Sequence, residues 1–473
     1  MTTAIVAGSG PNGLAAAAVL AAAGVEVTVL EAAATIGGGT RTSERTLPGL
    51  LHDHCSAFHP MGLGSPFLRG LDLGRYGVTW RWAKVDLAHP LAGGRAGVLT
   101  RSVADTAAGL GRDGPAWQRL FGGLASGFDQ LADDVMQPVA HVPRHPVTLA
   151  RFGLRAVQPA SWIARRWQTE EARALFAGMA AHGIYPLERP TTAAIGLMLA
   201  AAGHRYGWPV AEGGSRAISD ALAKVIAAHG GRIETGTPVT SLASLPPADI
   251  VMLDLAPAAV ARLAGGRLPD RVRRAYLRYR HGPGAFKLDL AVEGGVPWVN
   301  LDCRRAGTVH AGGTIGEIME AERAVHRGRL PDRPFVLVGQ QYLADPTRSR
   351  GGTHPVWVYG HVPAGYPGDA SEVILGQIER YAPGFRERIV ATVRTGPADW
   401  PAYNASYPGG DILTGANTPW QVLMRPRLTL SPYRTGIPGV YICSAATPPG
   451  AGVHGMGGRN AAVLALRDAR HRD

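Results

Sequence analysis

The first 31 residues contain the pattern that most restricts the fold of this chain. Thr3–Ala7 is a short apolar and β-branched run, which predicts a buried strand. The glycine-rich loop 8–13 follows, then an alanine-rich stretch at 14–23 that predicts a helix, and then a second predicted strand at 25–30. A strand, a glycine loop, a helix and a strand within about 30 residues predict a βαβ unit, and therefore an α/β fold with a parallel sheet.

The glycine spacing in this loop has a physical meaning for dinucleotide binding. Gly8 permits a tight turn, Gly10 lets the backbone approach a pyrophosphate, and Gly13 lets the helix and strand pack closely. The N-terminus of the helix offers free N–H groups and a favourable dipole to phosphate. Glu31 comes 18 residues after Gly13, where a carboxylate accepts hydrogen bonds from a ribose diol. A glycine turn without a nucleotide is the alternative, and the complete βαβ context disfavours it.

A second glycine-rich loop distinguishes FAD from NAD as the expected ligand. It spans residues 36–42, with three consecutive glycines at 37–39 and an arginine, Arg41, that can donate to a diphosphate. A ligand that extends beyond the first pyrophosphate contact, as FAD does, would use such a loop. A plain surface turn is the alternative for this segment taken alone. We therefore expect FAD.

The glycine spacing recurs near the C-terminus, at residues 450–455. Only 18 residues follow it, too few for another βαβ unit, so we do not expect a second dinucleotide domain. A strand at 439–443, the glycine loop and a helix at 459–467 are predicted instead. We expect the backbone of this loop to lie against a flat ring system.

The middle of the chain predicts two further kinds of structure. Residues 105–206 carry Trp, Phe and Met at helical spacings, which predicts a mostly helical insert whose apolar residues form core and in part face a ligand cavity. The runs 286–292, 334–338 and 356–358 are β-like and are separated by Pro and Gly, so they predict an antiparallel sheet.

Charge and cysteine content exclude several classes of function. The formal net charge is +12, but 45 of the 48 basic residues are arginines scattered along the chain, without the runs or interleaved aromatics of a nucleic-acid site. A solvated basic surface is expected, with an anionic membrane surface or an acidic substrate as the alternatives. Cys55, Cys303 and Cys443 lie far apart, so neither disulfides nor a metal site is expected, and a reducing compartment fits. We expect no signal peptide and no membrane span, and hence a cytoplasmic protein.

Taken together, these motifs resemble the phytoene-desaturase-like FAD oxidoreductases of the amine-oxidase and protoporphyrinogen-oxidase superfamily. The resemblance covers nearly the whole chain and rests on residues 8–13, 31, 37–42, 213–215 and 441–456, with further likeness at 51–60 and 286–289. It implies a discontinuous Rossmann-type FAD-binding domain (1–75, 208–262 and 425–473), a helical substrate or cap region (76–207) and a substrate domain containing the antiparallel sheet (263–424).

The resemblance also implies a set of FAD contacts. The ADP part would lie at the first loop, Glu31 and the strand near Val239, the pyrophosphate and ribityl chain at 38–41, and the isoalloxazine at 452–456. The implied residues are Gly8, Gly10, Pro11, Asn12, Gly13, Glu31, Ala32, Gly38, Gly39, Thr40, Arg41, Val239, Ala445, Gly452, Val453, His454, Gly455 and Met456. Many superfamily members carry an acid after the last strand, whereas Ser444 and Ala445 stand here, which favours the desaturase side.

The implied reaction is desaturation, saturation or isomerisation of a C–C bond in an apolar, isoprenoid- or lipid-like substrate, with oxygen, a quinone or no electron acceptor. Peripheral contact with a membrane is compatible with this chemistry. A flavin-dependent amine oxidase, with an aromatic cage and a smaller and more polar cavity, is one alternative. A flavin-binding protein with a non-catalytic interaction role is another.

Lys287 and His454 are the candidate catalytic residues. Lys287 lies in a predicted strand among apolar neighbours, where an inward side chain would have a lowered pKa. In related amine oxidases a lysine binds a water near flavin N5. The alternative for Lys287 is an outward, solvated side chain. His454 lies in the expected flavin loop, and the alternative is that it only orders this loop.

Overall fold

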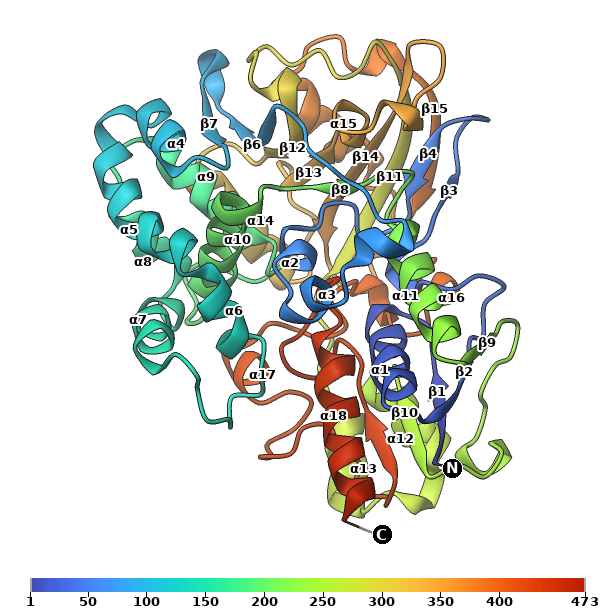
Figure 1. Cartoon of the computed structure of the whole chain (residues 1–473). Helices are drawn as coiled ribbons and strands as arrows, with labels where there is room; N and C mark the ends of the chain where they lie inside the picture. Colours follow the sequence, from blue (N-terminus) through green and yellow to red (C-terminus); the bar gives the residue numbers. More distant parts are fainter. Residues whose placement is uncertain (1, 472–473) are drawn as a thin grey trace.

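In the computed structural model, which describes residues 2–471, the N-terminal strand lies at the centre of a five-stranded sheet (Figure 1). The strand order is β16-β10-β1-β2-β9, and every neighbouring pair is parallel. The strands are β1 (Thr3–Ala7), β2 (Glu26–Leu30), β9 (Arg232–Glu234), β10 (Ile250–Leu253) and β16 (Val440–Ile442). Three stretches of chain far apart in sequence thus build one sheet, and the α/β fold with a discontinuous Rossmann-type domain is confirmed.

Helices cover both faces of the parallel sheet because its strands alternate their apolar side chains. Val6 packs with α1 (Pro11–Ala22), α11 (Arg216–Ala228) and α18 (Met456–Arg470) on one face. Ala7 packs with α12 (Pro257–Ala264) and α13 (Asp270–Leu277) on the other. The domain boundary expected at residue 262 therefore falls inside α12, and this part of the chain stays with the parallel sheet through α13.

Close backbone packing fixes α1 against its neighbours. A Cβ atom on Gly13 would lie 2.2 Å from the carbonyl oxygen of Gly8, and one on Gly458 would lie 1.8 Å from the carbonyl oxygen of Asn12. Neither position can carry a side chain, so the glycine loop and the start of α18 are held in van der Waals contact.

The second sheet has seven strands in the order β15-β11-β14-β13-β12-β6-β7 (Figure 1). Its neighbours pair antiparallel except for β12 and β6, which are parallel. The expected antiparallel sheet is confirmed, although two of its strands come from the region 76–207 that was expected to be helical. The strands are β6 (Val85–Pro90), β7 (Ala96–Leu99), β11 (Gly284–Glu293), β12 (Ala306–Ala311), β13 (Val336–Gly339), β14 (Thr353–Val362) and β15 (Ile389–Thr395).

A helical layer packs on one face of this sheet. Trp117, Phe121, Trp167 and Phe176 are completely buried in its core, as the sequence predicts, whereas Trp162 is 55% exposed. The helices are α4 (Val103–Gly109), α5 (Gly114–Ser126), α6 (Phe128–Val135), α7 (Pro146–Ala156), α8 (Ala160–Ala164), α9 (Glu170–Ala181) and α10 (Thr192–Tyr206).

Shorter elements connect these layers. The small strands are β3 (Thr42–Glu44), β4 (Leu51–Asp53), β5 (Trp80–Arg81) and β8 (Val210–Ala211). The remaining helices are α2 (Pro60–Leu63), α3 (Pro66–Gly70), α14 (Ile315–His326), α15 (Ser371–Glu379), α16 (Trp400–Tyr403) and α17 (Pro419–Leu423). Within residues 2–471, no helix combines the length and the apolar character needed to cross a membrane.

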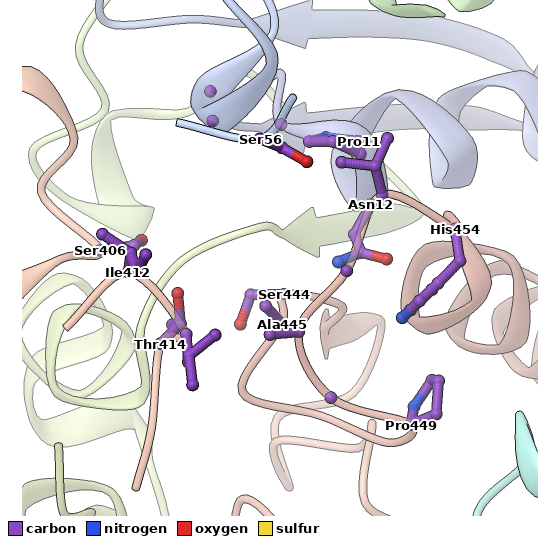
Figure 2. A pocket seen from close by; sticks show the side chains of 18 of the residues that line it. Pro11, Asn12, Ser56, Ser406, Ile412, Thr414, Ser444, Ala445, Pro449 and His454 are labelled. Atoms are coloured by element: carbon purple, nitrogen blue, oxygen red, sulfur yellow. The ribbon is translucent and has the colours of Figure 1, made fainter. Parts of the chain in front are cut away.

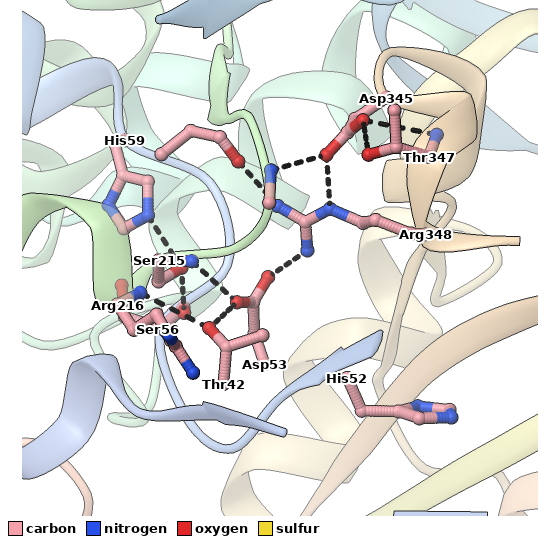
Figure 3. A network of polar contacts seen from close by, with 12 residues as sticks. Thr42, His52, Asp53, Ser56, His59, Ser215, Arg216, Asp345, Thr347 and Arg348 are labelled. Carbon is pink, nitrogen blue, oxygen red and sulfur yellow. Dashed lines mark hydrogen bonds and ion pairs between the residues drawn. The ribbon is translucent and has the colours of Figure 1, made fainter. Parts of the chain in front are cut away.

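A buried polar network joins the two sheet regions at Arg348 (Figure 3). The guanidinium is fully buried and pairs with Asp53 at 2.5 Å and with Asp345 at 3.1 Å. Asp53 also accepts from the backbone N–H of Ser215 and the hydroxyl of Thr42, each at 2.7 Å. The arginine and these hydrogen bonds hold the pKa of the Asp53 carboxyl below its usual value despite its burial. The segments 51–60 and 213–215, which contributed to the resemblance, thus serve in part to hold the architecture.

Candidate functional site

A cavity of about 1320 Å³ runs from the carboxyl edge of the parallel sheet into the helical layer. We call its first part the dinucleotide half, lined by both glycine loops, Glu31, Asp254 and the segment 444–454. We call its second part the apolar half, lined by side chains of α6, α7, α10 and α17. Figure 2 shows Pro11 and Asn12 of the first loop facing Ser444, Ala445 and His454 of the C-terminal segment. The cavity is therefore placed at the carboxyl ends of parallel strands, where α/β folds bind ligands.

Fourteen of the 18 implied FAD contacts line this cavity, and the other four do not. The backbone N–H of Gly13 donates to Asp254 at 2.9 Å, and the hydroxyl of Thr40 donates to the carbonyl of Gly37 at 2.7 Å. Gly455 and Met456 lie at the start of α18, outside the lining. The fourteen lining residues are Gly8, Gly10, Pro11, Asn12, Glu31, Ala32, Gly38, Gly39, Arg41, Val239, Ala445, Gly452, Val453 and His454.

The two N-terminal glycine loops touch each other. A Cβ atom on Gly38 would lie 3.0 Å from the Cα atom of Gly10. A Cβ atom on Gly10 would in turn lie 2.6 Å from Oδ2 of Asp254. Bare backbone therefore forms this part of the cavity wall, which is the arrangement that lets a pyrophosphate approach main-chain N–H groups.

Glu31 is held by hydrogen bonds at the end of β2. Its carboxylate accepts from the backbone N–H groups of Ser9 and Ala33, each at 2.9 Å. Arg41 lies 3.4 Å from Glu31 and donates to the carbonyl of Thr35 at 2.9 Å. An acid with fixed orientation and a neighbouring guanidinium thus face the same end of the cavity.

Asp254 is a site residue that the sequence analysis missed. It follows β10 directly, lines the cavity, and accepts from the backbone N–H of Gly13 at 2.9 Å. Burial raises the pKa of its carboxyl to about 7, and the nearby Glu31 carboxylate adds to the shift. The signal was present, because Asp254 follows the apolar run at 250–253, and an acid at the carboxyl end of a parallel strand lies at the ligand edge of the sheet.

The segment around α16 was also missed. The hydroxyl of Tyr403 donates to the carbonyl of Gly38 at 2.7 Å, and the guanidinium of Arg41 lies 5.3 Å from the centre of the Tyr403 ring. A Cβ atom on Gly39 would lie 2.5 Å from the hydroxyl of Tyr407. This segment belongs to the region assigned to the substrate domain, and no spacing in its sequence predicts that it covers a loop some 360 residues earlier.

His454 is buried in the cavity wall, where it orders the loop. Its Nδ1 accepts from the backbone N–H of Met456 at 3.1 Å, and its carbonyl accepts from the hydroxyl of Ser65 at 2.6 Å. Burial lowers the pKa of the imidazole to about 4, so the ring is neutral at pH 7. These contacts favour the loop-ordering alternative, and a catalytic role for His454 stays a prediction.

Lys287 is buried, which excludes the outward and solvated alternative, but it is not among the residues that line the cavity. Its ammonium group pairs with Asp289, which lies two residues along β11 on the same face. Asp289 also lies 2.8 Å from Arg45. Burial lowers the pKa of Lys287, and the Asp289 carboxylate opposes this shift. The structure thus places Lys287 in a buried ion pair beside the site.

A histidine pair lies at the inner wall of the apolar half. His182 lines the cavity, and its Nε2 lies 3.0 Å from Nε2 of the fully buried His310. Burial lowers the pKa of His182 to about 3, so the ring is neutral. Among the described residues, no group of three or more His, Cys, Asp or Glu is arranged to hold a metal ion.

The residues present fit an adenine dinucleotide. Bare glycine backbone stands at the N-terminus of α1, an oriented acid stands at the end of β2, and Arg41 lies beside that acid. The cavity continues from there past Ala445 and Gly452 towards the apolar half, so it extends well beyond the first loop. This is the donor and acceptor set that the βαβ fingerprint is built to supply.

Comparison with known proteins supports the same fold. Residues 6–67 match the family model of an NAD(P)-binding Rossmann-like domain. The rat pyridine nucleotide-disulfide oxidoreductase domain-containing protein 2 (Rattus norvegicus) is 25% identical to this chain over 561 residues. The match covers 99% of this chain and 94% of the rat protein. The mouse protein of the same name (Mus musculus) is also 25% identical, over 558 residues.

Three solved structures are similar along their whole length. An oxidoreductase from Methanosarcina mazei has a TM-score of 0.64 and 18% identity, with 98% of this chain and 100% of that chain covered. A wild-type putrescine oxidase bound to putrescine has a TM-score of 0.61 and 19% identity, with coverages of 100% and 98%. The CLA-producing fatty acid isomerase from P. acnes has a TM-score of 0.56 and 15% identity, with coverages of 98% and 98%. The chain therefore has the mixed α/β fold of these proteins, with a Rossmann-like dinucleotide domain.

Proposed function

We propose that this protein is an FAD-dependent oxidoreductase that desaturates, saturates or isomerises a C–C bond in an apolar, isoprenoid- or lipid-like substrate. The observation that carries the proposal is the continuity of the cavity, which joins the dinucleotide half directly to the apolar half. A bound flavin would supply a hydride acceptor next to that chamber. FAD is favoured over NAD because the second glycine loop and the C-terminal loop extend the dinucleotide half beyond the first βαβ unit.

The apolar half suits a hydrocarbon chain. Its walls carry Phe152, Ile195, Met198 and Leu199 from α7 and α10, and Met136 from the end of α6. Burial of such a chain against these side chains gives roughly 0.8 kcal/mol per CH₂ group. The protein would bind the substrate mainly by this burial, and would exclude water from the reacting carbon atoms.

The charges of the lining argue against an amine as substrate. Of the acids that line the cavity, Glu31 and Asp254 belong to the dinucleotide half. The third, Asp134, accepts from the backbone N–H groups of Arg144 and His145, each at 2.8 Å. An ammonium group in the apolar half would therefore lack a carboxylate partner that is not already engaged in the fold.

An amine oxidase is the second candidate, and one observation favours it. Trp357 and Tyr359 line the cavity as a T-shaped pair, with ring centres 4.9 Å apart. Aromatic faces of this kind also attract cations. The fold is compatible with both candidates, since both a putrescine oxidase and a fatty acid isomerase are similar to this chain.

Anaerobic reduction of the flavin separates the two candidates. The purified oxidised holoprotein, mixed with a panel of isoprenoids, long-chain lipids and amines, should lose its oxidised-flavin absorption with an apolar member that it desaturates, and dithionite-reduced holoprotein should regain that absorption with one that it saturates. A net isomerisation would instead show as product without lasting loss of absorption, so the product mixture is analysed as well. Turnover confined to small amines would support the second candidate and overturn the first. A colourless protein that does not take up added FAD would overturn both.

We also propose that the substrate is taken from a lipid surface. Residues 135–168 contain five arginines and no acid, and residues 412–433 contain no acid and two arginines, of which Arg425 is buried and Arg427 is partly exposed. Large apolar side chains are exposed on both segments, including Val142 at 91%, Leu154 at 72% and Leu430 at 79%. Val139, Leu423 and Leu430 line one small hollow, so the two segments lie side by side. Exposed apolar side chains among arginines are the combination that binds an anionic membrane surface.

A further inference from the structure

Arg425 is a buried cation in the wall of the cavity. Its side chain is only 3% exposed, and it lies two residues after the end of the short helix α17. A Cβ atom on Gly450, which also lines the cavity, would lie 2.9 Å from Nη1 of Arg425. The guanidinium end of the side chain, and not only its aliphatic stem, therefore lies at the cavity wall.

All of the protein partners of this guanidinium are neutral. Nε donates to the carbonyl of Gln421 at 3.0 Å, Nη2 to the side-chain oxygen of Asn417 at 2.8 Å, and Nη1 to the carbonyl of Ala445 at 3.4 Å. No carboxylate among residues 2–471 forms an ion pair with Arg425. A buried charge ordinarily has a counter-charge, because the cost of removing it from water is several kcal/mol.

The acid that shares a neighbour with Arg425 is engaged elsewhere. Burial raises the pKa of the Tyr279 phenol, and the charges of Arg425 and Asp411 act on this pKa in opposite directions, so both groups lie near the same ring. The Asp411 carboxylate, however, accepts from the backbone N–H groups of Gly282 at 2.9 Å and Gly415 at 2.7 Å, and interacts with His281 at 3.0 Å. The positive charge at Arg425 is thus left for a ligand.

Arg425 stands where the two halves of the cavity meet. Val422 and Leu423, which precede it, line the apolar half, while Ala445 and Gly450 belong to the dinucleotide half. Asn417, which orients the guanidinium, also donates to the carbonyl of Gly183 at 3.0 Å, next to His182. The arginine is thereby fixed between the start of the apolar chamber and its inner polar wall.

We infer that Arg425 is an anchor for the carboxylate of the substrate, which makes the substrate class of this enzyme a long-chain carboxylic acid. The inference rests on the proposed function and narrows it. Carboxylate oxygens accept the guanidinium N–H groups that the protein leaves unused, and they supply the missing negative charge. The hydrocarbon chain of the same molecule then extends along the apolar half.

The test compares ligands of equal chain length on the holoprotein. Decanoate, decanol and decylamine are titrated while the perturbation of the bound flavin spectrum is followed. The wild-type protein should bind decanoate more tightly than decanol by about tenfold or more, which is the range for a charged hydrogen bond, and decylamine most weakly. The Arg425→Gln variant should lose the preference for decanoate and keep its affinity for decanol.

Arg427→Gln is the matched control, because it removes the same charge two residues away and outside the cavity lining. It should keep the wild-type preference. FAD affinity, measured by titration of the apoprotein, should be equal in wild type and Arg425→Gln.

An equal affinity for decanoate and decanol in the wild type would overturn the inference without any variant, even if Arg425→Gln failed to fold. A large loss of FAD affinity with an unchanged carboxylate preference would also overturn it, because the arginine would then serve the cofactor. Neither result would affect the proposed C–C chemistry, which the flavin-reduction panel tests separately.

Discussion

Ionisable side chains in the interior of this protein differ in whether a charged partner lies beside them. Lys287, Asp289 and Arg348 are paired with each other or with other protein charges, and they hold strands and loops in register. Asp254 and Arg425 line the cavity and have no charged protein partner in the described structure. Since a buried charge without a counter-charge is costly, Arg425 marks a place where an anionic ligand fits, whereas burial raises the pKa of Asp254 so that its carboxyl holds a proton more readily.

Gly10→Val should abolish FAD binding without unfolding the protein globally. Any Cβ atom at this position comes within 2.6 Å of Asp254, and the larger side chain would also displace a pyrophosphate from the loop. Flavin content after purification and titration with added FAD measure the effect. Gly266→Val serves as the control, because a Cβ atom there meets nothing within 4 Å. Full flavin occupancy in Gly10→Val would show that the first loop is not the cofactor site.

Asp254 should make FAD affinity depend on pH. Its carboxyl has a pKa of about 7 in the folded protein, and Glu31, Tyr407 and Cys443 are the ionisable groups that face it. An ionised Asp254 repels a pyrophosphate, so affinity should fall as pH rises through about 7. The Asp254→Asn variant should bind FAD with little change over the same range, as measured by titration between roughly pH 5 and pH 9.

The same carboxyl affects stability with a defined sign. Its folded pKa is raised, so the protonated form stabilises the fold, and this contribution is lost as pH rises from the usual value of 3.8 to about 7. Asp254→Asn should therefore gain stability relative to wild type across that window. Asp220→Asn, on the surface of α11, should show neither effect. If the free energy of unfolding depended on pH in the same way for wild type and Asp254→Asn, this assignment would be contradicted.

Lys287→Met should lower stability more than catalysis. Removing the ammonium group leaves Asp289 buried with fewer positive neighbours, a change that costs on the order of 3 kcal/mol. Because Lys287 does not line the cavity, flavin reduction at matched FAD content should proceed at the wild-type rate. Chemical denaturation and stopped-flow absorbance measure the two effects, with the exposed Lys224→Met as control. A reduction rate lowered tenfold or more at matched FAD content would restore the catalytic interpretation.

Among the elements, α7 and the stretch from α17 to Leu430 combine two roles. Their inner residues, such as Phe152 and Val422, line the cavity, while outer residues such as Leu154 and Leu428 are exposed. A short amphipathic element of this kind can contact lipid on one side and the substrate chamber on the other. Placement of the cavity beside this surface would let an apolar substrate enter without crossing water.

Co-sedimentation with vesicles tests the role of this surface. The protein should bind vesicles that contain phosphatidylglycerol more strongly than vesicles of phosphatidylcholine alone, and added salt should weaken the difference. Replacing Leu428 and Leu430 together by Ser should reduce binding several-fold, because two exposed leucines then no longer enter the interface. Leu301→Ser changes an exposed leucine elsewhere and should have no effect. Equal binding of the double variant and wild type would exclude this surface.

At the scale of the whole molecule, the proposed cofactor site is assembled from distant parts of the chain. The cavity wall takes residues from near 10, 40, 240, 254, 405 and 450, and these come together only in the folded state. A ligand that binds there stabilises the native state alone. Occupancy and folding are therefore thermodynamically linked.

FAD should raise the melting temperature of the apoprotein in a concentration-dependent way. At a free concentration of 100 times Kd the stabilisation is about 2.7 kcal/mol. FMN, which lacks the adenosine part, should give much less, because Glu31 and the first glycine loop would remain without their ligand. Differential scanning fluorimetry with FAD, FMN and ADP distinguishes these cases. Equal stabilisation by FMN and FAD would contradict a dinucleotide site.

The sequence by itself determined the features that depend on neighbouring residues. The βαβ unit, the strand edges and the helical insert follow from apolar periodicity and glycine spacing, which act over a few to about 30 residues. The same local logic located Gly10, Gly38 and Glu31 in the cavity wall. The sequence prediction was wrong for β6 and β7, which lie in a region that was expected to be helical. Their place in the second sheet depends on pairing with residues far away in the chain.

Only the tertiary structure decided which distant residues meet. Asp254 reaches Gly13 across 241 positions, and Tyr403 reaches Gly38 across 365, through sheet order and loop packing that no short pattern encodes. The tertiary structure also distinguishes two buried cations. Lys287 has a carboxylate beside it, whereas Arg425 has none in the described chain. The chemistry of a charged side chain depends on its desolvation and on its neighbours in space, and both of these are set by the fold.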